Sequence, residues 1–143
     1  MKHNIGNILA AGFAIVGLAA LASCAGEKFH VTGSIANAKD SLLYFEHNGL
    51  DGFSTVDSVK LDEKGSFSFS GDKVDNPEFY RLRIAGQIIN IGIDSTETVD
   101  VKATYPQMAT DYTVKGSSEN EKIKELALKQ IDLQARCQSI LAE

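Results

Sequence analysis

The segment from Val56 to Gly71 reads VDSVKLDEKGSFSFSG and contains the clearest strand pattern in the sequence. Phe67 and Phe69 alternate with serines, which places both rings on one face of a strand, because strand side chains repeat with a period of two. A second alternating stretch precedes the turn cluster from Asp62 to Gly65, where Gly easily adopts a positive φ. The segment therefore predicts a β-hairpin, and none of its residues indicates a particular chemistry.

Alternating segments of this kind recur along the chain at intervals of roughly 8 to 12 residues, as in antiparallel sandwiches and barrels. No helical segment separates them, so we expect no parallel pairing. The sequence predicts a mainly β protein: an antiparallel β-sandwich of about eight strands over residues 29–116, followed by one C-terminal amphipathic α-helix in residues 117–143. Besides the two arms of the first hairpin, the predicted strands are Phe29–Ile35, Ser41–His47, the two arms of a second hairpin within Phe79–Asp94, Thr98–Ala103 and Tyr112–Lys115.

Glycines and prolines mark the connections between these strands. Residues Asn48 to Gly52 have the composition of a loop. In the second hairpin, Ala85 and Gly86 form the expected turn. Gly92 interrupts a run of isoleucines in the return arm, which indicates a bulge or a close approach of another backbone segment.

The C-terminal segment changes to a helical period. Ser118 and Glu121 have the spacing of a capping box, and we expect the helix to run from about Glu119 to Leu141. Its stripe fits heptad a and d positions over fewer than three heptads, so packing on the domain's own sheet and pairing with a protein partner or a second copy are both open interpretations. The stripe consists of Ile123, Leu126, Gln130, Leu133, Cys137 and Ile140.

The N-terminus has the layout of a secretory signal. Lys2 precedes an apolar run from Ile8 to Leu18, and small residues follow. The run is too short for a comfortable membrane span. We expect residues 1–23 to be a signal peptide and residues 24–28 to be a tether.

The last residues of this signal, Leu21, Ala22, Ser23 and Cys24, resemble the lipobox of bacterial lipoproteins. The lipobox requires Cys because its thiolate is the nucleophile that accepts the diacylglycerol. A diacylglyceryl and N-acyl Cys24 would carry the several acyl chains that stable anchoring needs. The pattern predicts a membrane-anchored lipoprotein of the bacterial envelope with its domain facing the periplasm. An ordinary signal peptide with an incidental Cys24 is the alternative.

The chain is acidic, with a formal net charge of −5, and its signal contributes one positive charge. This balance argues against nucleic acid as a partner, because nucleic acid binding requires a basic surface. The negative charge of the domain likewise provides no electrostatic attraction to an anionic membrane, so anchoring would depend on the lipid.

Cysteine and histidine are too few for the common metal and disulfide sites. The chain has two cysteines, and acylation of Cys24 would leave Cys137 alone. The three histidines, His3, His30 and His47, are scattered, which excludes a structural zinc site by ligand supply. We therefore expect no metal and no cofactor.

Within the helix, Cys137 is the strongest candidate for a chemically reactive residue. Its unpaired thiol could take part in redox chemistry or form a disulfide between two copies of the chain. The alternative is that Cys137 is a small buried apolar residue that packs the helix on the sheet. The sequence shows no group nearby that would activate it.

Other candidate sites are weaker. Arg81 and Arg83 share a strand face and either hold an anion or are solvated. The acidic residues from Asp94 to Asp100 lack the spacing of a calcium loop. Asp57 and Ser58 are adjacent, but no His is placed in sequence to complete a triad.

Several short segments follow one another in a recognisable order, namely Val56-Asp57-Ser58, Leu61-Asp62, Gly65-Ser66-Phe67-Ser68-Phe69-Ser70-Gly71, Pro77, Phe79-Tyr80-Arg81-Leu82 and Val114-Lys115-Gly116-Ser117. Together they resemble an uncharacterised β-domain of bacterial envelope lipoproteins. That domain lies N-terminal to thioredoxin-like, AhpC/TSA-type thiol-disulfide oxidoreductases, and the resemblance covers about Phe29 to the terminal helix. It implies a helical linker and then a thioredoxin domain with a Cys-x-x-Cys pair, which this sequence lacks.

These observations favour a non-enzymatic, lipid-anchored accessory or binding domain on the periplasmic side of a bacterial envelope. Two alternatives remain open. The chain is the N-terminal fragment of a thioredoxin-like oxidoreductase whose catalytic domain is missing, or it is a small-ligand carrier that uses the sandwich interior or one of its ends.

Overall fold

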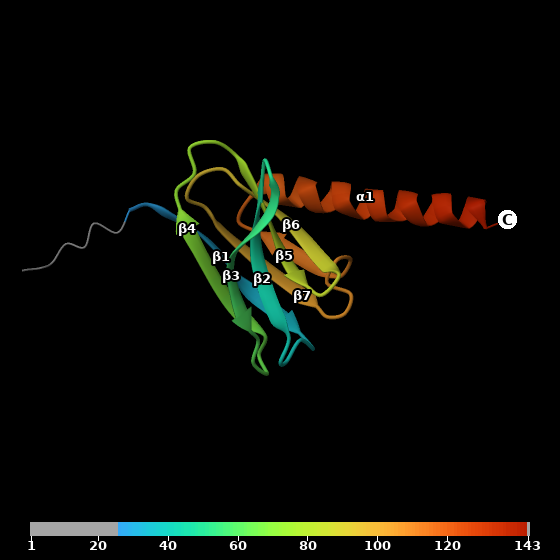
Figure 1. The fold of residues 1–143 in the computed structure, drawn as a ribbon, viewed down its shortest axis with the longest axis horizontal. Helices are drawn as coiled ribbons and strands as arrows, with labels where there is room; N and C mark the ends of the chain where they lie inside the picture. The colour runs from blue at the N-terminus through green and yellow to red at the C-terminus, as the bar shows by residue number, and fades with distance from the viewer. Residues whose placement is uncertain (1–25, 143) are drawn as a thin grey trace, which may run out of the picture.

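The computed structural model describes residues 26–142, which form two packed four-stranded sheets and one helix that projects from them (Figure 1). The predicted β-sandwich with a C-terminal helix is therefore confirmed. In chain order the elements are β1 (Lys28–Ala36), β2 (Leu42–Gly49), β3 (Gly52–Lys60), β4 (Ser66–Asp72), β5 (Glu78–Ile84), β6 (Gln87–Ile93), β7 (Thr98–Thr104), β8 (Tyr112–Lys115) and α1 (Ser118–Leu141).

The first sheet has the strand order β4-β1-β7-β8, and the second has the order β3-β2-β5-β6. All neighbouring pairs are antiparallel except β1 and β7, which run parallel with Val31 beside Val99 and Ile35 beside Ala103. The expectation of no parallel pairing was wrong. A parallel pair needs a long crossover connection, and here strands β2 to β6 supply it in place of a helix.

The predicted hairpin from Val56 to Gly71 is also wrong in its pairing. Both arms are strands, but β3 pairs with β2 in the second sheet, whereas β4 pairs with β1 in the first. The connection crosses between the sheets: the N–H of buried Leu61 donates to Ser41, and the N–H of Ile35 donates to the carbonyl of Gly65. Alternation identified the buried face of β4, whereas β3 is exposed along almost its whole length. In neither strand does alternation contain information about the pairing partner.

The second predicted hairpin is confirmed, because β5 and β6 pair antiparallel with Leu82 opposite Ile89. The loop predicted at Asn48 to Gly52 is shorter than expected. β2 continues to Gly49 and β3 begins at Gly52, so that only Leu50 and Asp51 form the turn.

Aromatic side chains join the two sheets in the core. Phe67 and Phe69 are both buried, as their alternation with exposed serines predicted. Phe69 of the first sheet stacks on Phe45 of the second with 5.2 Å between ring centroids, and Phe45 stacks in turn on Tyr80 at 5.0 Å. Burial of rings from both sheets is a main source of stability in such a domain.

Helix α1 begins one residue earlier than the capping-box pattern indicated. Ser117, not Ser118, is the N-cap, and its hydroxyl accepts a hydrogen bond from the N–H of Asn120 at 3.4 Å. The first turns of α1 contact the edge strands β6 and β8, whereas the rest of the helix extends past the sandwich (Figure 1). From Lys129 to Leu141 every residue of α1 is exposed.

A search of residues 26–142 finds no helix with the length and apolar character needed to cross a membrane.

Candidate functional site: a groove between the helix and the second sheet

The outer face of the second sheet is set by alternation along its strands. Because Tyr80 and Leu82 of β5 point into the core, Phe79 and Arg81 point outward. The strand register then places Glu46 of β2 on one side of Arg81 and Asn90 of β6 on the other. Aromatic, charged and amide side chains are thus neighbours on one surface.

A buried carboxylate organises the charges of this surface. Glu46 is only 5% exposed, and the guanidinium groups of Arg81 and Arg83 both hydrogen-bond to it. Arg83 Nη2 lies 2.8 Å from Glu46 Oε1, and the hydrogen bond from Arg83 is the main cause that holds the pKa of Glu46 below its usual range. The two arginines therefore belong to an internal ion cluster. The sequence had suggested an anion site or a solvated pair, and the observed arrangement is neither.

Each arginine of the cluster also covers an aromatic ring. The guanidinium carbon of Arg81 lies 3.4 Å from the ring centroid of Phe53, and that of Arg83 lies 4.5 Å from the ring centroid of Tyr44. Such cation–π contacts hold both partners in place. Phe53, which is 48% exposed, is thereby fixed on the outer face of the second sheet, on edge strand β3.

The side-chain amide of Asn120 links the start of helix α1 to this sheet. Asn120 is fully buried, its Oδ1 accepts from the N–H of Gly92 at 2.8 Å, and its Nδ2 donates to the carbonyl of Gly92 at 2.8 Å. Asn120 thus satisfies a donor and an acceptor on the outer side of edge strand β6. A Cβ on Gly92 would lie 2.9 Å from Ile123 Cδ1, so the helix approaches this glycine through its side chains, whereas the sequence suggested a bulge or a close backbone segment.

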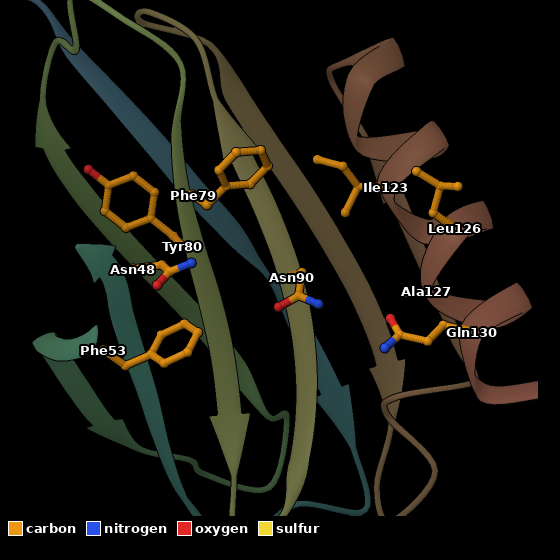
Figure 2. A pocket seen from close by; sticks show the side chains of 9 residues that line it. All are labelled: Asn48, Phe53, Phe79, Tyr80, Asn90, Ile123, Leu126, Ala127 and Gln130. Atoms are coloured by element: carbon orange, nitrogen blue, oxygen red, sulfur yellow. The ribbon is translucent and has the colours of Figure 1, made fainter. Parts of the chain in front are cut away.

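Between α1 and the outer face of the second sheet lies a groove of about 350 Å³ (Figure 2). Phe79 and Ile123 are on its two sides, and the amides of Asn90 and Gln130 lie further along it. Phe79 is 53% exposed, so its ring offers apolar surface to the groove. The lining residues are Asn48, Phe53, Phe79, Tyr80, Asn90, Ile123, Leu126, Ala127 and Gln130.

The lining supplies apolar surface and amide hydrogen bonds. Within residues 26–142, the side chains that line this groove include no charged group. Its one titratable group is Tyr80, whose hydroxyl donates to Glu78 at 3.2 Å and whose pKa burial raises to about 12. The uncharged, largely apolar lining suits the binding of an uncharged, partly apolar group.

The residues of the predicted lipobox, Leu21, Ala22, Ser23 and Cys24, lie outside the described residues. Cys137 lies on the projecting half of α1 and is exposed. The interpretation of Cys137 as a buried residue that packs the helix on the sheet was therefore wrong, because α1 leaves the sandwich before it reaches this position.

The other candidates from the sequence have local roles. The carboxylate of Glu97 accepts hydrogen bonds from the N–H groups of Asp94 at 2.6 Å and Ser95 at 2.8 Å, and so closes the turn before β7. Asp57 accepts from the N–H of its neighbour Ser58 at 2.7 Å. In the part of the chain that the structure describes, no three His, Cys, Asp or Glu residues gather as metal ligands would.

Sequence reasoning missed Glu46 and Asn120, the two residues that organise this surface. Glu46 follows the apolar run Leu42 to Phe45, and Asn120 lies among charged residues at the start of α1, so neither position looked buried. The isolated Gly92 was the one available signal, since it indicated that another segment approaches the strand.

Comparison with known proteins places the chain in a family. Residues 29–123 match the domain of unknown function DUF4369. The curated proteins contain no match. A solved structure with some similarity is the crystal structure of (S)-allantoin synthase, with a TM-score of 0.43 and 12% identity over 64% of this chain and 44% of that chain, so the match spans less than half of that protein's length. Because the family match extends over more than half of the sequence, this chain belongs to the DUF4369 family.

Proposed function

We propose that this DUF4369 chain is a non-enzymatic, lipid-anchored accessory domain that faces the periplasm in a bacterial envelope and binds its ligand or partner through the groove. The observation that carries the proposal is the groove itself, whose uncharged lining combines exposed Phe79 with the amides of Asn90 and Gln130. Apolar surface with a few placed polar groups is typical of binding sites.

The groove part of the proposal is tested with the neutral fluorophore Nile red as the probe. We expect its emission to increase on binding to the full chain, and Phe79→Ala to remove most of the increase. Val56→Ala is the matched control, because Val56 is similarly exposed at 48% but lies outside the groove lining. An equal response of the wild type and Phe79→Ala would contradict binding in the groove.

Anchoring through Cys24 is supported by the lipobox Leu21-Ala22-Ser23-Cys24 after an apolar signal. Cells that express the chain are labelled with radioactive palmitate and then fractionated. We expect label and membrane association in the wild type, loss of both in Cys24→Ala, and retention of both in the control Cys137→Ala. A Cys24→Ala protein that still carried label and still sedimented with membranes would exclude this anchor.

A second candidate function is that of the N-terminal part of a thioredoxin-like oxidoreductase. It is favoured by the projection of α1 beyond the sandwich, with Leu133 61% exposed and Ile140 70% exposed, as in a linker whose apolar residues pack on another domain. The genomic sequence downstream of codon 143 distinguishes the two functions. A continuous reading frame that encodes a Cys-x-x-Cys pair would support the oxidoreductase, and an intergenic region would count against it.

A further inference from the structure

The projecting part of α1 carries an apolar stripe that the domain leaves uncovered. Its d positions, Leu126, Leu133 and Ile140, are 66%, 61% and 70% exposed. They alternate at spacings of three and four with a positions Ile123, Gln130 and Cys137, which is the pattern of a two-helix seam. Solvent exposure of three large side chains on one helix face is costly unless another surface covers them.

The length and chemistry of the stripe indicate what covers it. It begins inside the groove, where Ile123, Leu126 and Gln130 belong to the lining, and it continues along the helix to Ile140. From Ile123 to Ile140 the stripe extends over about 26 Å, at 1.5 Å of rise per residue. A small molecule cannot cover an uncharged strip of this length, whereas a second helix with the same strip matches it in length, spacing and lack of charge.

The charges beside the stripe favour one orientation. The g positions are all basic, namely Lys122, Lys129 and Arg136, whereas the e positions Ala127, Gln134 and Leu141 are uncharged. An antiparallel pair would bring the basic g positions of both helices together, but a parallel pair places each g position beside an uncharged e position. The carboxylates that pair with Lys129 and Arg136 come from c positions, Glu125 and Asp132, further from the seam.

We propose that α1 pairs in parallel with α1 of a second copy of this chain through the stripe from Leu126 to Ile140. Gln130 then faces its own counterpart across the two-fold axis and fixes the register by a side-chain hydrogen bond. Cys137 faces its counterpart one heptad further along. The dimer goes beyond the proposed function and does not depend on the lipid anchor, but it uses Leu126 and Gln130, which also line the groove.

Cys137 provides the first test, because Cys24→Ala leaves it as the only thiol in the full chain. Oxidised glutathione is the oxidant: one Sγ–Sγ bond forms between two Cys137 side chains, and the glutathione disulfide is reduced to two thiols that take up the two protons. We expect a covalent dimer on a non-reducing gel. The control Cys137→Ser with Ala135→Cys moves the thiol to the opposite helix face and is expected to cross-link far less.

Sedimentation equilibrium of the Cys24→Ala chain under reducing conditions is the second test. Leu133→Asp places a charge in the seam and is expected to raise the dimer dissociation constant at least about tenfold. Ala135→Asp introduces the same side chain on the exposed face two residues away and is expected to leave the constant unchanged. A monomer at every concentration, or equal effects of the two aspartates, would overturn the proposal.

The orientation is tested by adding Leu126→Cys to the Cys24→Ala chain. In a parallel pair the introduced thiol cross-links to its own counterpart, and Cys137 cross-links to Cys137. Mass spectrometry of the oxidised dimer identifies the linked peptides. A bond between the introduced thiol and Cys137 of the second copy would contradict the parallel arrangement.

Discussion

Asn120 of α1 and Gly92 of β6 exchange two hydrogen bonds of 2.8 Å, so that the side-chain amide of a helix residue binds the backbone of an edge strand. We predict that Asn120→Ala destabilises the domain by about 1–3 kcal/mol, because it removes both hydrogen bonds to the half-buried backbone of Gly92. Chemical denaturation measures the loss, and amide hydrogen exchange should show faster exchange in the first turns of α1. The neighbouring exposed Glu121→Gln should change neither. An unaltered Asn120→Ala protein would mean that the helix is held by other contacts.

The ion cluster at Glu46 gives a prediction with a pH dependence. Glu46→Gln removes the charge that Arg81 and Arg83 share, and we expect a loss of about 1–3 kcal/mol near neutral pH. The folded-state pKa of Glu46 is lowered, so its stabilisation is fully present above the unfolded pKa of roughly 4.3 and is lost as the pH falls through the folded pKa. The difference between wild type and variant should therefore shrink below about pH 4.

The control for the ion cluster is Glu63→Gln, which breaks the exposed pair with Lys39 and should cost at most about 0.5–1 kcal/mol. Urea unfolding of all three proteins from pH 3 to pH 7 measures both effects. A gap between wild type and Glu46→Gln that widened on acidification would contradict the lowered pKa.

Gly65 closes the turn between the sheets, with φ of 63°, and a Cβ there would lie 2.0 Å from the backbone oxygen of Ile35. We predict that Gly65→Ala costs about 2–4 kcal/mol, because it combines a left-handed backbone with a clash against another backbone segment. Gly86→Ala is the matched control, since a Cβ at Gly86 meets no atom within 4 Å. Similar melting temperatures of the two variants would show that this turn tolerates a side chain.

The exposed phenylalanines of the groove should separate binding from stability. Phe53 holds the guanidinium of Arg81, whereas Phe79 lies on the sheet side of the groove and is 53% exposed. Phe79→Ala should therefore leave the melting temperature nearly unchanged, while Phe69→Ala in the core should cost about 3–5 kcal/mol. Thermal unfolding of both variants checks this contrast. A large loss of stability in Phe79→Ala would make its side chain part of the core.

The sequence predicted the elements of this fold better than their partners. The hairpin of β5 and β6 was predictable because its turn and its pairing are local. The pairing of β3 and β4 was not, because alternation at Phe67 and Phe69 identifies a buried face that either sheet can use. The parallel pair of β1 and β7 depends on strands far apart in the chain, and no local pattern indicates it.

The candidate site was less predictable than the fold, for a related reason. Glu46 and Asn120 are polar residues whose burial depends on groups distant in sequence, namely the arginines of β5 and the backbone of β6. The exposure of Cys137 depends on where α1 leaves the sandwich, which the helical period does not determine. The sequence predicted the heptad spacing of the stripe, but it did not predict that most of the stripe projects beyond the sandwich.

Because α1 is attached to the sandwich by its first turns, the rest of the helix is a rigid arm that pivots near Asn120. The described chain begins near one end of the molecule, and the helix extends away toward the other (Figure 1). A small rotation at this pivot displaces each residue of α1 in proportion to its distance from Asn120, along a helix of about 36 Å in total. The contacts of the first turns of α1 with β6 and β8 therefore set the direction in which the exposed apolar residues of its far half are presented.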